Sequence, residues 1–252
     1  MSKLKSVLTA SALLSAVAAL PASAADAGTT VVLVHGAFAD GSAWAKVIPL
    51  LQAKGVHVVA VQNPLTSLTD DVAAVQRVVD AQSGKVVLVG HSWGGAVITQ
   101  AGSSDKIKAL VYVAAFAPSK GEAVGGLGPG YPVAPGPTTF RPDANGFIYM
   151  SQESLAANFG QDLPPAEIKL MAATQGPLHV KGVGEALTYA AWETKPNYYI
   201  VASQDRMIAP EMERAFAKKM KAVTTELNGS HSVMLSQPAK VAEVILTAVA
   251  RP

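Results

Sequence analysis

The sequence of 252 residues contains no cysteine, few aromatic residues (6%) and few charged residues (15%). The absence of thiols excludes disulfide bonds and thiolate catalysis. Because half of the residues are hydrophobic, the chain can form a large core, built mainly from valine, alanine, leucine and isoleucine. The length fits one globular domain, and no internal repeat divides it.

The N-terminal residues have the order of a secretory signal peptide. Lys3 and Lys5 precede the apolar stretch Val7–Leu20, and the small-residue sequence Pro21–Ala24 follows. We expect residues 1–24 to be cleaved and the protein to be exported to a bacterial periplasm or the medium. An amphipathic first helix or a retained anchor is the alternative, although the apolar stretch is too short to span a bilayer comfortably.

Removal of this segment changes the charge balance. The full chain has 20 basic and 18 acidic residues, and residues 1–24 contain two lysines and no acid. The remaining chain is formally neutral and has no basic run, so a nucleic acid is not an expected partner. We expect a small-molecule substrate and no stable membrane insertion, and we leave a homodimer open.

Short apolar runs alternate with helix-like stretches from Thr29 onward. This alternation predicts an α/β fold in which helices cover both faces of a parallel sheet. The expected strands are short and rich in β-branched residues, as buried parallel strands should be: Val31–Val34, Val56–Val61, Val86–Val89, Leu110–Ala114, Tyr198–Val201 and Val223–Leu227. The expected helices are Ala43–Ala53, Asp70–Ala81, Trp93–Ala101, Pro210–Met220 and Pro238–Val249.

A long interval, about 118–196, interrupts the alternation between the fourth and fifth expected strands. Its first part, Pro118–Pro142, is rich in glycine and proline, which predicts irregular loop. Helix-like pieces follow at Glu153–Asn158, Pro165–Thr174 and Val183–Trp192. We expect this insertion to form a lid, because long insertions in compact domains are usually functional or disordered and this one has helical, apolar pieces.

The strongest chemical signal is Gly90-His91-Ser92-Trp93-Gly94, between an apolar strand and a helix start. Gly-x-Ser-x-Gly in this context is typical of a nucleophile elbow, in which a strained turn exposes the serine hydroxyl. The helix N-terminus would also favour developing negative charge. We therefore predict Ser92 as a nucleophile. The alternative is a turn whose glycines serve packing alone.

His231 is the expected base, because a serine hydroxyl is a poor nucleophile near neutral pH without one. It lies in a polar loop, 228–232, where the carboxyl edge of the sheet would bring it over Ser92. The alternative is a surface histidine. Of the other four histidines, His57 falls in an expected strand and His179 in the expected lid. His35 and His91 lie beside the motif turns.

An acid is expected between the serine and the histidine in chain order. Asp205 follows the expected strand Tyr198–Val201 and would hold the productive tautomer of the histidine. It could instead pair with Arg206 or cap a helix. Glu122, after the fourth expected strand, is the competing acid.

Acyl transfer also needs donors for the oxyanion. We expect the backbone N–H groups of Ala37 and Trp93 to serve, with Phe38 as a substitute for Ala37. An ordinary turn at His35-Gly36 is the alternative. A set of apolar residues could line a substrate pocket, although most of them could equally pack the core or lid: Phe38, Trp93, Phe116, Tyr131, Phe140, Met150, Phe159, Met171, Trp192, Met207 and Met234. From this set we assign substrate contact to Phe38, Trp192 and Met207.

Four motifs together resemble α/β-hydrolases of the hydroxynitrile lyase and plant methyl-ester esterase branch, and more closely its bacterial carboxylesterases. They are Val34–Phe38, Gly90–Gly95, Ser203–Ile208 and Gly229–Ser236. The resemblance covers nearly all of residues 25–252 and implies a six-stranded, mainly parallel core. It also places the acid of the family on Asp205 and its base on His231.

The branch includes lyases, from which this sequence departs at two positions. Hydroxynitrile lyases of this type have threonine where this chain has Gly36, and lysine where it has Ser232. Without that lysine, no group is evident that would stabilise departing cyanide. Haloalkane dehalogenases and epoxide hydrolases use aspartate at the elbow, so Ser92 excludes their mechanisms.

The sequence thus predicts a carboxylesterase that cleaves short-acyl or aromatic esters through an acyl-enzyme, with no metal or organic cofactor. The alternatives are a non-catalytic small-molecule binder on a hydrolase scaffold, a hydroxynitrile lyase and a perhydrolase-type activity.

Overall fold

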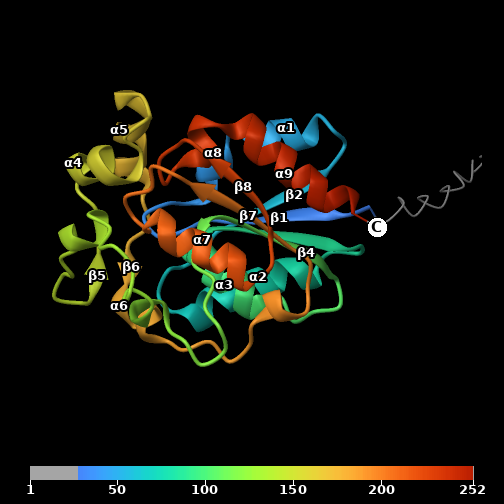
Figure 1. The fold of residues 1–252 in the computed structure, drawn as a ribbon. Helices are drawn as coiled ribbons and strands as arrows, with labels where there is room; N and C mark the ends of the chain where they lie inside the picture. The colour runs from blue at the N-terminus through green and yellow to red at the C-terminus, as the bar shows by residue number, and fades with distance from the viewer. Residues whose placement is uncertain (1–27, 252) are drawn as a thin grey trace, which may run out of the picture.

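The computed structural model describes residues 28–251. A central sheet lies between two layers of helices, and a group of short elements gathers at one end of it (Figure 1). The predicted signal sequence, 1–24, lies outside the described residues and stays a prediction. Among the residues that are described, no helix combines the length and apolarity needed to cross a bilayer.

The sheet has six parallel strands in the order β2-β1-β3-β4-β7-β8. The four central strands are buried almost throughout because both of their faces are covered, and their sequences are accordingly apolar without alternation. The edge strands β2 and β8 are partly exposed. These features confirm the predicted fold class. The bounds are β1 Thr30–Val34, β2 His57–Val61, β3 Val86–Ser92, β4 Ile107–Ala115, β7 Asn197–Ala202 and β8 Val223–Leu227.

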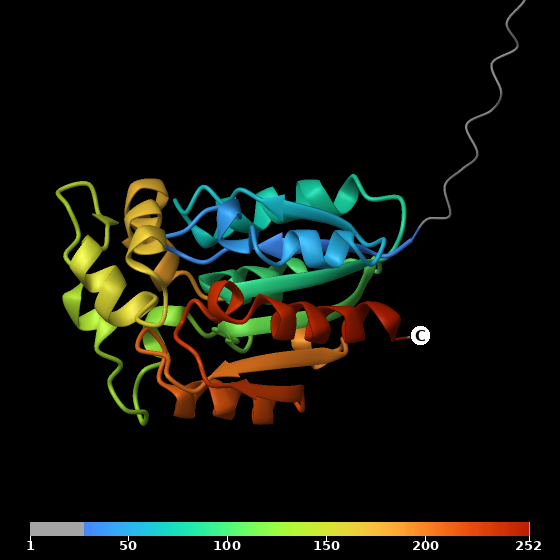
Figure 2. The same cartoon turned by 90° about the horizontal axis from the view of Figure 1, so that it is seen from above.

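Helices cover the two faces of the sheet and create two apolar cores (Figures 1 and 2). In β1, Val31 and Leu33 belong to the core under α1 and α9, whereas Val32 and Val34 belong to the core under α2, α3 and α7. This alternation follows from the two-residue period of a strand. The bounds are α1 Ile48–Gln52, α2 Leu68–Asp80, α3 Trp93–Ala101, α7 Pro210–Lys219 and α9 Pro238–Ala250.

The expected continuous helix Ala43–Ala53 is wrong. A short 3-10 helix occupies Gly41–Trp44, and α1 begins only at Ile48. Pro49 lies in the first turn of α1, where its missing N–H costs nothing. Further inside a helix, its ring would clash with the carbonyl group four residues earlier. The proline therefore starts α1 and prevents one helix from running through residues 45–49.

Residues 118–196, named the lid segment after their predicted role, form a layer of short elements at the carboxyl ends of the strands (Figures 1 and 2). The last part of the segment returns past the end of α3 to the start of β7. The expected helix Val183–Trp192 is wrong, because α6 ends at Gly184 and only a 3-10 turn, Ala191–Glu193, follows. Two glycines in α6 weaken any longer helix there. The elements are 3-10 turns at Val124–Gly126 and Gly136–Thr139, β5 Phe147–Ile148, α4 Gln152–Ser154, a π-helical turn Leu155–Phe159, α5 Pro165–Thr174, β6 Leu178–His179 and α6 Val180–Gly184.

Candidate active site

Ser92 lies at the junction of β3 and α3, at the carboxyl edge of the sheet. Its backbone has φ 53° and ψ −122°, a conformation that is strained for a residue with a side chain. A Cβ on Gly90 would lie 2.5 Å from the carbonyl oxygen of Gly94, and one on Gly94 would lie 2.5 Å from that of Val34. Both glycines are therefore required for strand, turn and helix to approach this closely.

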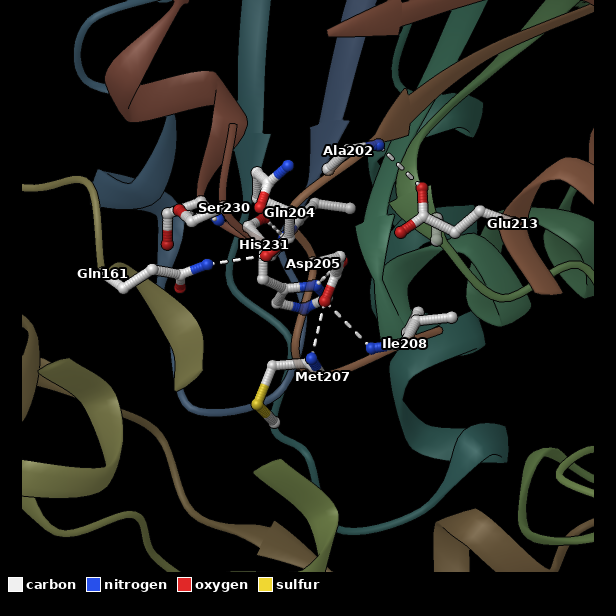
Figure 3. Close-up of polar contacts among 12 residues, drawn as sticks. Gln161, Ala202, Gln204, Asp205, Met207, Ile208, Glu213, Ser230 and His231 are labelled. Atoms are coloured by element: carbon white, nitrogen blue, oxygen red, sulfur yellow. Dashed lines mark hydrogen bonds and ion pairs between the residues drawn. The ribbon is translucent and has the colours of Figure 1, made fainter. Parts of the chain in front are cut away.

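Asp205 and His231 form a buried pair above the same edge (Figure 3). The imidazole Nδ1–H donates to Oδ2 of Asp205 at 2.5 Å. The other oxygen, Oδ1, accepts the backbone N–H groups of Met207 at 2.6 Å and Ile208 at 2.9 Å. Because Nδ1 carries the proton, Nε2 of the neutral ring has the free lone pair. In residues 28–251 this buried nitrogen has no hydrogen-bond partner.

His91, the residue before Ser92, contacts His231. The Nε2–H of His91 donates to the carbonyl oxygen of His231 at 2.9 Å, and the two rings lie 4.6 Å apart. The Ser92 hydroxyl does not hydrogen-bond to Nε2 of His231 in the described chain. Catalytic hydrogen bonds are often long in free enzymes and tighten in the substrate complex. The structure thus joins Asp205 to His231 directly and places His91, the residue before Ser92, against the ring of His231.

The two histidines of the motif turns have structural hydrogen bonds. His35 donates from Nδ1 to the carbonyl oxygen of Gly36 at 2.8 Å and accepts the Asn63 N–H at Nε2 at 2.9 Å. Burial lowers the pKa of His35, and burial together with the neighbouring His231 lowers the pKa of His91 further. Both rings are therefore neutral near pH 7 and hold the turns on either side of Ser92.

The competing acid, Glu122, has other contacts. Its carboxylate accepts the backbone N–H of Ser119 at 2.6 Å and lies 3.7 Å from Nζ of Lys219. The hydrogen bond from Ser119 lowers the pKa of Glu122. Glu122 is exposed and stabilises a surface turn, whereas Asp205 contacts the histidine. Within residues 28–251 Arg206 forms no ion pair with Asp205, and its guanidinium donates to the carbonyl oxygen of Ala157.

The expected oxyanion donors differ in their availability. Phe38 N–H already donates to the carbonyl oxygen of Gly176 in the lid segment at 3.1 Å. The N–H groups of Ala37 and Trp93 have no acceptor within residues 28–251. Phe38 is therefore a poor substitute, and the geometry leaves Ala37 and Trp93 as the pair of free donors.

An apolar cavity of about 250 Å³ lies between the β1 turn and α5 of the lid segment. Phe159, in its wall, also packs edge-on against the ring of His231 with 4.8 Å between centroids. The ion pair of Lys46 with Glu167, 2.6 Å apart, belongs to the same wall. Four of the residues predicted to line a pocket do so: Phe38, Phe159, Met171 and Met234.

Two of the three assigned substrate contacts lie elsewhere. Trp192 donates from Nε1 to the carbonyl oxygen of Pro118, and Nζ of Lys219 lies 5.0 Å above its ring. Met207 is buried against Gly136 of the lid segment. Neither residue lines the 250 Å³ cavity, whereas Phe38 does.

Asp71 is a site residue that the sequence analysis missed. Its fully buried carboxylate accepts Nε1–H of Trp93 at Oδ2 and the backbone N–H of Leu65 at Oδ1, both at 2.7 Å. Burial raises its pKa to about 6, against the opposing effect of these two hydrogen bonds. Asp71 thereby fixes the side chain of Trp93, whose backbone N–H is a candidate oxyanion donor. An aspartate in the first turn of a helix gives no sequence signal for such a contact.

We expect Asp71→Asn to change how stability depends on pH. The folded-state pKa of about 6 exceeds the ordinary 3.8, so the folded protein binds more protons than the unfolded chain between these values. The wild-type free energy of unfolding, relative to the variant, should therefore fall by about 2–3 kcal/mol from pH 4 to pH 7. Urea unfolding across this range measures the difference, with the exposed Asp105→Asn as control. A difference that stays constant with pH would contradict the assignment.

Comparison with known proteins identifies the family. Residues 31–244 match the model described as the alpha/beta hydrolase family. The chain belongs to this family. This α/β hydrolase is 29% identical over 252 aligned residues to the pyrethroid hydrolase of Sphingobium wenxiniae, and the alignment covers 86% of each protein. It is 26% identical to the alpha-hydroxynitrile lyase of Arabidopsis thaliana, over 83% of this chain and 93% of that protein.

The solved structures show the same fold. Polyneuridine aldehyde esterase superposes on this α/β hydrolase with a TM-score of 0.77 at 22% identity, over 87% of this chain and 98% of the other. The family match and these relatives confirm the resemblance found from the four sequence motifs. Relatives named as hydrolases and esterases also agree with the expectation that the protein is an enzyme.

Proposed function

We propose that this α/β hydrolase is a serine carboxylesterase, with Ser92 as nucleophile, His231 as base and Asp205 as the group that orients the base. The observation that carries the proposal is the buried Asp205–His231 pair, whose Nε2 lone pair is free and whose ring packs against His91, the residue before the strained Ser92. In this pair the carboxylate of Asp205 keeps the proton on Nδ1 of His231, which leaves Nε2 free to accept a proton. A protein that only binds a ligand has no need of such a base. A serine hydrolase needs this arrangement.

The reaction has two steps. His231 removes the Ser92 proton as Oγ attacks the ester carbonyl, and the N–H groups of Ala37 and Trp93 stabilise the oxyanion. Collapse of the tetrahedral intermediate expels the alcohol, which the imidazolium protonates. His231 then deprotonates a water molecule, which attacks the acyl-enzyme and releases the acid with Ser92 restored.

The cavity supports an apolar substrate group. Its walls carry Phe38, Phe159, Met171 and Met234. Of its three charged residues, Lys46 pairs with Glu167, and Asp40 caps the following 3-10 helix by accepting the Ser42 N–H. A volume of about 250 Å³ suits a short acyl chain or one aromatic ring better than a long chain or a sugar. Relatives named as a pyrethroid hydrolase and as a methylesterase support hydrolysis of an ester.

A series of p-nitrophenyl esters with increasing acyl length tests this proposal. We expect kcat/KM to be highest for short acyl chains and to fall once the chain outgrows the cavity. Met171→Ala, which enlarges the cavity, should move the optimum to longer chains, whereas Lys169→Ala, exposed on the same helix and outside the cavity lining, should move it less. No turnover of any ester would favour a binding protein, and no dependence on chain length would reject the cavity as the acyl site.

Hydroxynitrile lyase activity is less well supported, although one relative carries that name. Ser232 is fully buried and uncharged, so it cannot stabilise cyanide as lysine could. A Cβ at Gly36 would lie 2.7 Å from Cβ of Ser92, so a threonine there would require the turn to shift. Assay with mandelonitrile separates the two activities, because ester hydrolysis without cyanide release is expected. A perhydrolase-type side activity is checked in the same preparation with acetate and peroxide.

A further inference from the structure

Glu213, on α7, has a fully buried carboxyl group behind the proposed catalytic pair. Its Oε2 accepts the backbone N–H of Ala202 at 2.9 Å, at the end of β7 (Figure 3). Its Oε1 is buried too, and has no hydrogen-bond partner in the described part of the chain. A buried, unpaired carboxylate oxygen is costly, so the ionised form of Glu213 does not fit this place.

The groups around Glu213 do not neutralise a negative charge. Asp205, in the loop after β7, is the carboxyl group that interacts with it most strongly. Tyr199 of β7 is a neutral neighbour whose hydroxyl donates to Ala115. Arg214, the next residue on α7, is exposed and forms a bidentate pair with Glu226 of β8. Burial raises the pKa of Glu213 well above its ordinary value, and the charge of Asp205 raises it further.

Glu213 accepts the N–H of Ala202, and Asp205 donates its backbone N–H to the carbonyl oxygen of Ala202 at 3.0 Å, so both buried residues hold the same turn. Two buried carboxyl groups this close are not both ionised, and the hydrogen bonds show which one keeps the proton. Asp205 accepts three N–H groups, from His231, Met207 and Ile208. Glu213 accepts only one. Donors stabilise the charged form of a carboxyl group, so Asp205 carries the charge and Glu213 carries the proton.

We propose that Glu213 is a positioning residue whose carboxylic acid O–H donates to the carboxylate of Asp205 and helps to hold it against Nδ1 of His231. The proposal rests on the proposed esterase function. It gives the unpaired Oε1 of Glu213 a partner and supplies Asp205 with a fourth donor. The proton stays on Glu213 throughout the cycle, because the reaction moves protons only between Ser92, His231, water and the leaving alcohol.

The variants Glu213→Gln and Glu213→Leu separate this role from packing. The glutamine amide is neutral, has nearly the same shape and can still donate to Asp205, whereas leucine fills the space without donating. We expect Glu213→Gln to retain kcat within a few-fold of wild type and to leave the acid limb of kcat/KM against pH where it is. We expect Glu213→Leu to lower kcat roughly 10- to 100-fold with little change in KM.

The pH profile discriminates between the protonation states. If Glu213 were ionised, Glu213→Gln would remove a negative charge near the imidazole and shift the acid limb to lower pH by about one unit. That shift would overturn the proposal. A Glu213→Leu variant that loses thermal stability but keeps the wild-type kcat would also overturn it, because a purely structural role has that result.

Infrared spectroscopy supplies a readout that does not depend on catalysis. At pH 8, well above the pKa of about 6 of Asp71, wild type should show the carbonyl band of a buried, protonated carboxylic acid, and Glu213→Gln should lack it. This measurement decides the proposal even if Glu213→Leu does not fold, and absence of the band in wild type would reject it. Phosphonate labelling of Ser92 reports separately on the esterase function, so failure of one proposal is distinguishable from failure of the other.

Discussion

Ser92→Ala is expected to lower kcat for ester hydrolysis by about 10⁴- to 10⁶-fold, with little change in KM or in the free energy of unfolding. The substitution removes the only atom that forms the acyl-enzyme bond, while the β3–α3 turn and the N–H donors stay in place. Initial rates with a p-nitrophenyl ester, compared with urea unfolding of the same preparations, measure both effects.

Ser83→Ala is the matched control for this substitution. Ser83 is exposed in the loop before β3, at the opposite end of that strand from Ser92. We expect the control to retain the wild-type kcat. A Ser92→Ala enzyme that hydrolyses esters at the wild-type rate would refute the nucleophile.

Asp205→Asn is expected to lower kcat by about 10⁴-fold. Oδ1 must still accept the N–H groups of Met207 and Ile208, so the asparagine amide NH₂ would replace Oδ2 opposite Nδ1 of His231. Two donors cannot face each other, and the ring would therefore shift to the tautomer with its proton on Nε2. That nitrogen could then no longer accept the Ser92 proton.

Glu122→Gln distinguishes the two candidate acids. Glu122 contacts Ser119 and Lys219 at the surface, so we expect this variant to remain within about two-fold of wild type, as is usual for exposed sites. Measurement of kcat for Glu122→Gln and Asp205→Asn under the same conditions distinguishes the two candidate acids. A large loss in Glu122→Gln together with wild-type activity in Asp205→Asn would assign the acid to Glu122 instead.

Features that depend on neighbours in sequence could be predicted from the sequence. The buried strands are continuous apolar runs, and the elbow places Gly90, Ser92 and Gly94 within five residues. The prediction of one helix at Ala43–Ala53 is wrong, although the residue that prevents this helix, Pro49, is visible in the sequence. The apolar spacing alone favours one long helix, but the proline starts α1 and excludes a helix through the preceding residues.

Features that depend on tertiary contacts could not be predicted in this way. Asp71 contacts Trp93, 22 residues away, only because α2 packs beside α3. Glu213 resembles any acid in the first turn of a helix, and its burial beside Asp205 follows from how α7 packs on β7. Trp192 was assigned to the substrate because it is aromatic and in the lid segment, but its indole N–H is used by Pro118.

The identity of the nucleophile is tested most directly by covalent labelling. Wild-type protein is incubated with a p-nitrophenyl phosphonate, and the adduct is located by intact-mass measurement and peptide mapping. We expect one adduct per chain, on Ser92, with release of one equivalent of p-nitrophenol and simultaneous loss of esterase activity, and we expect no adduct on Ser92→Ala. An adduct on a different residue, or inactivation of ester hydrolysis without modification of Ser92, would contradict the assignment of Ser92 as the nucleophile.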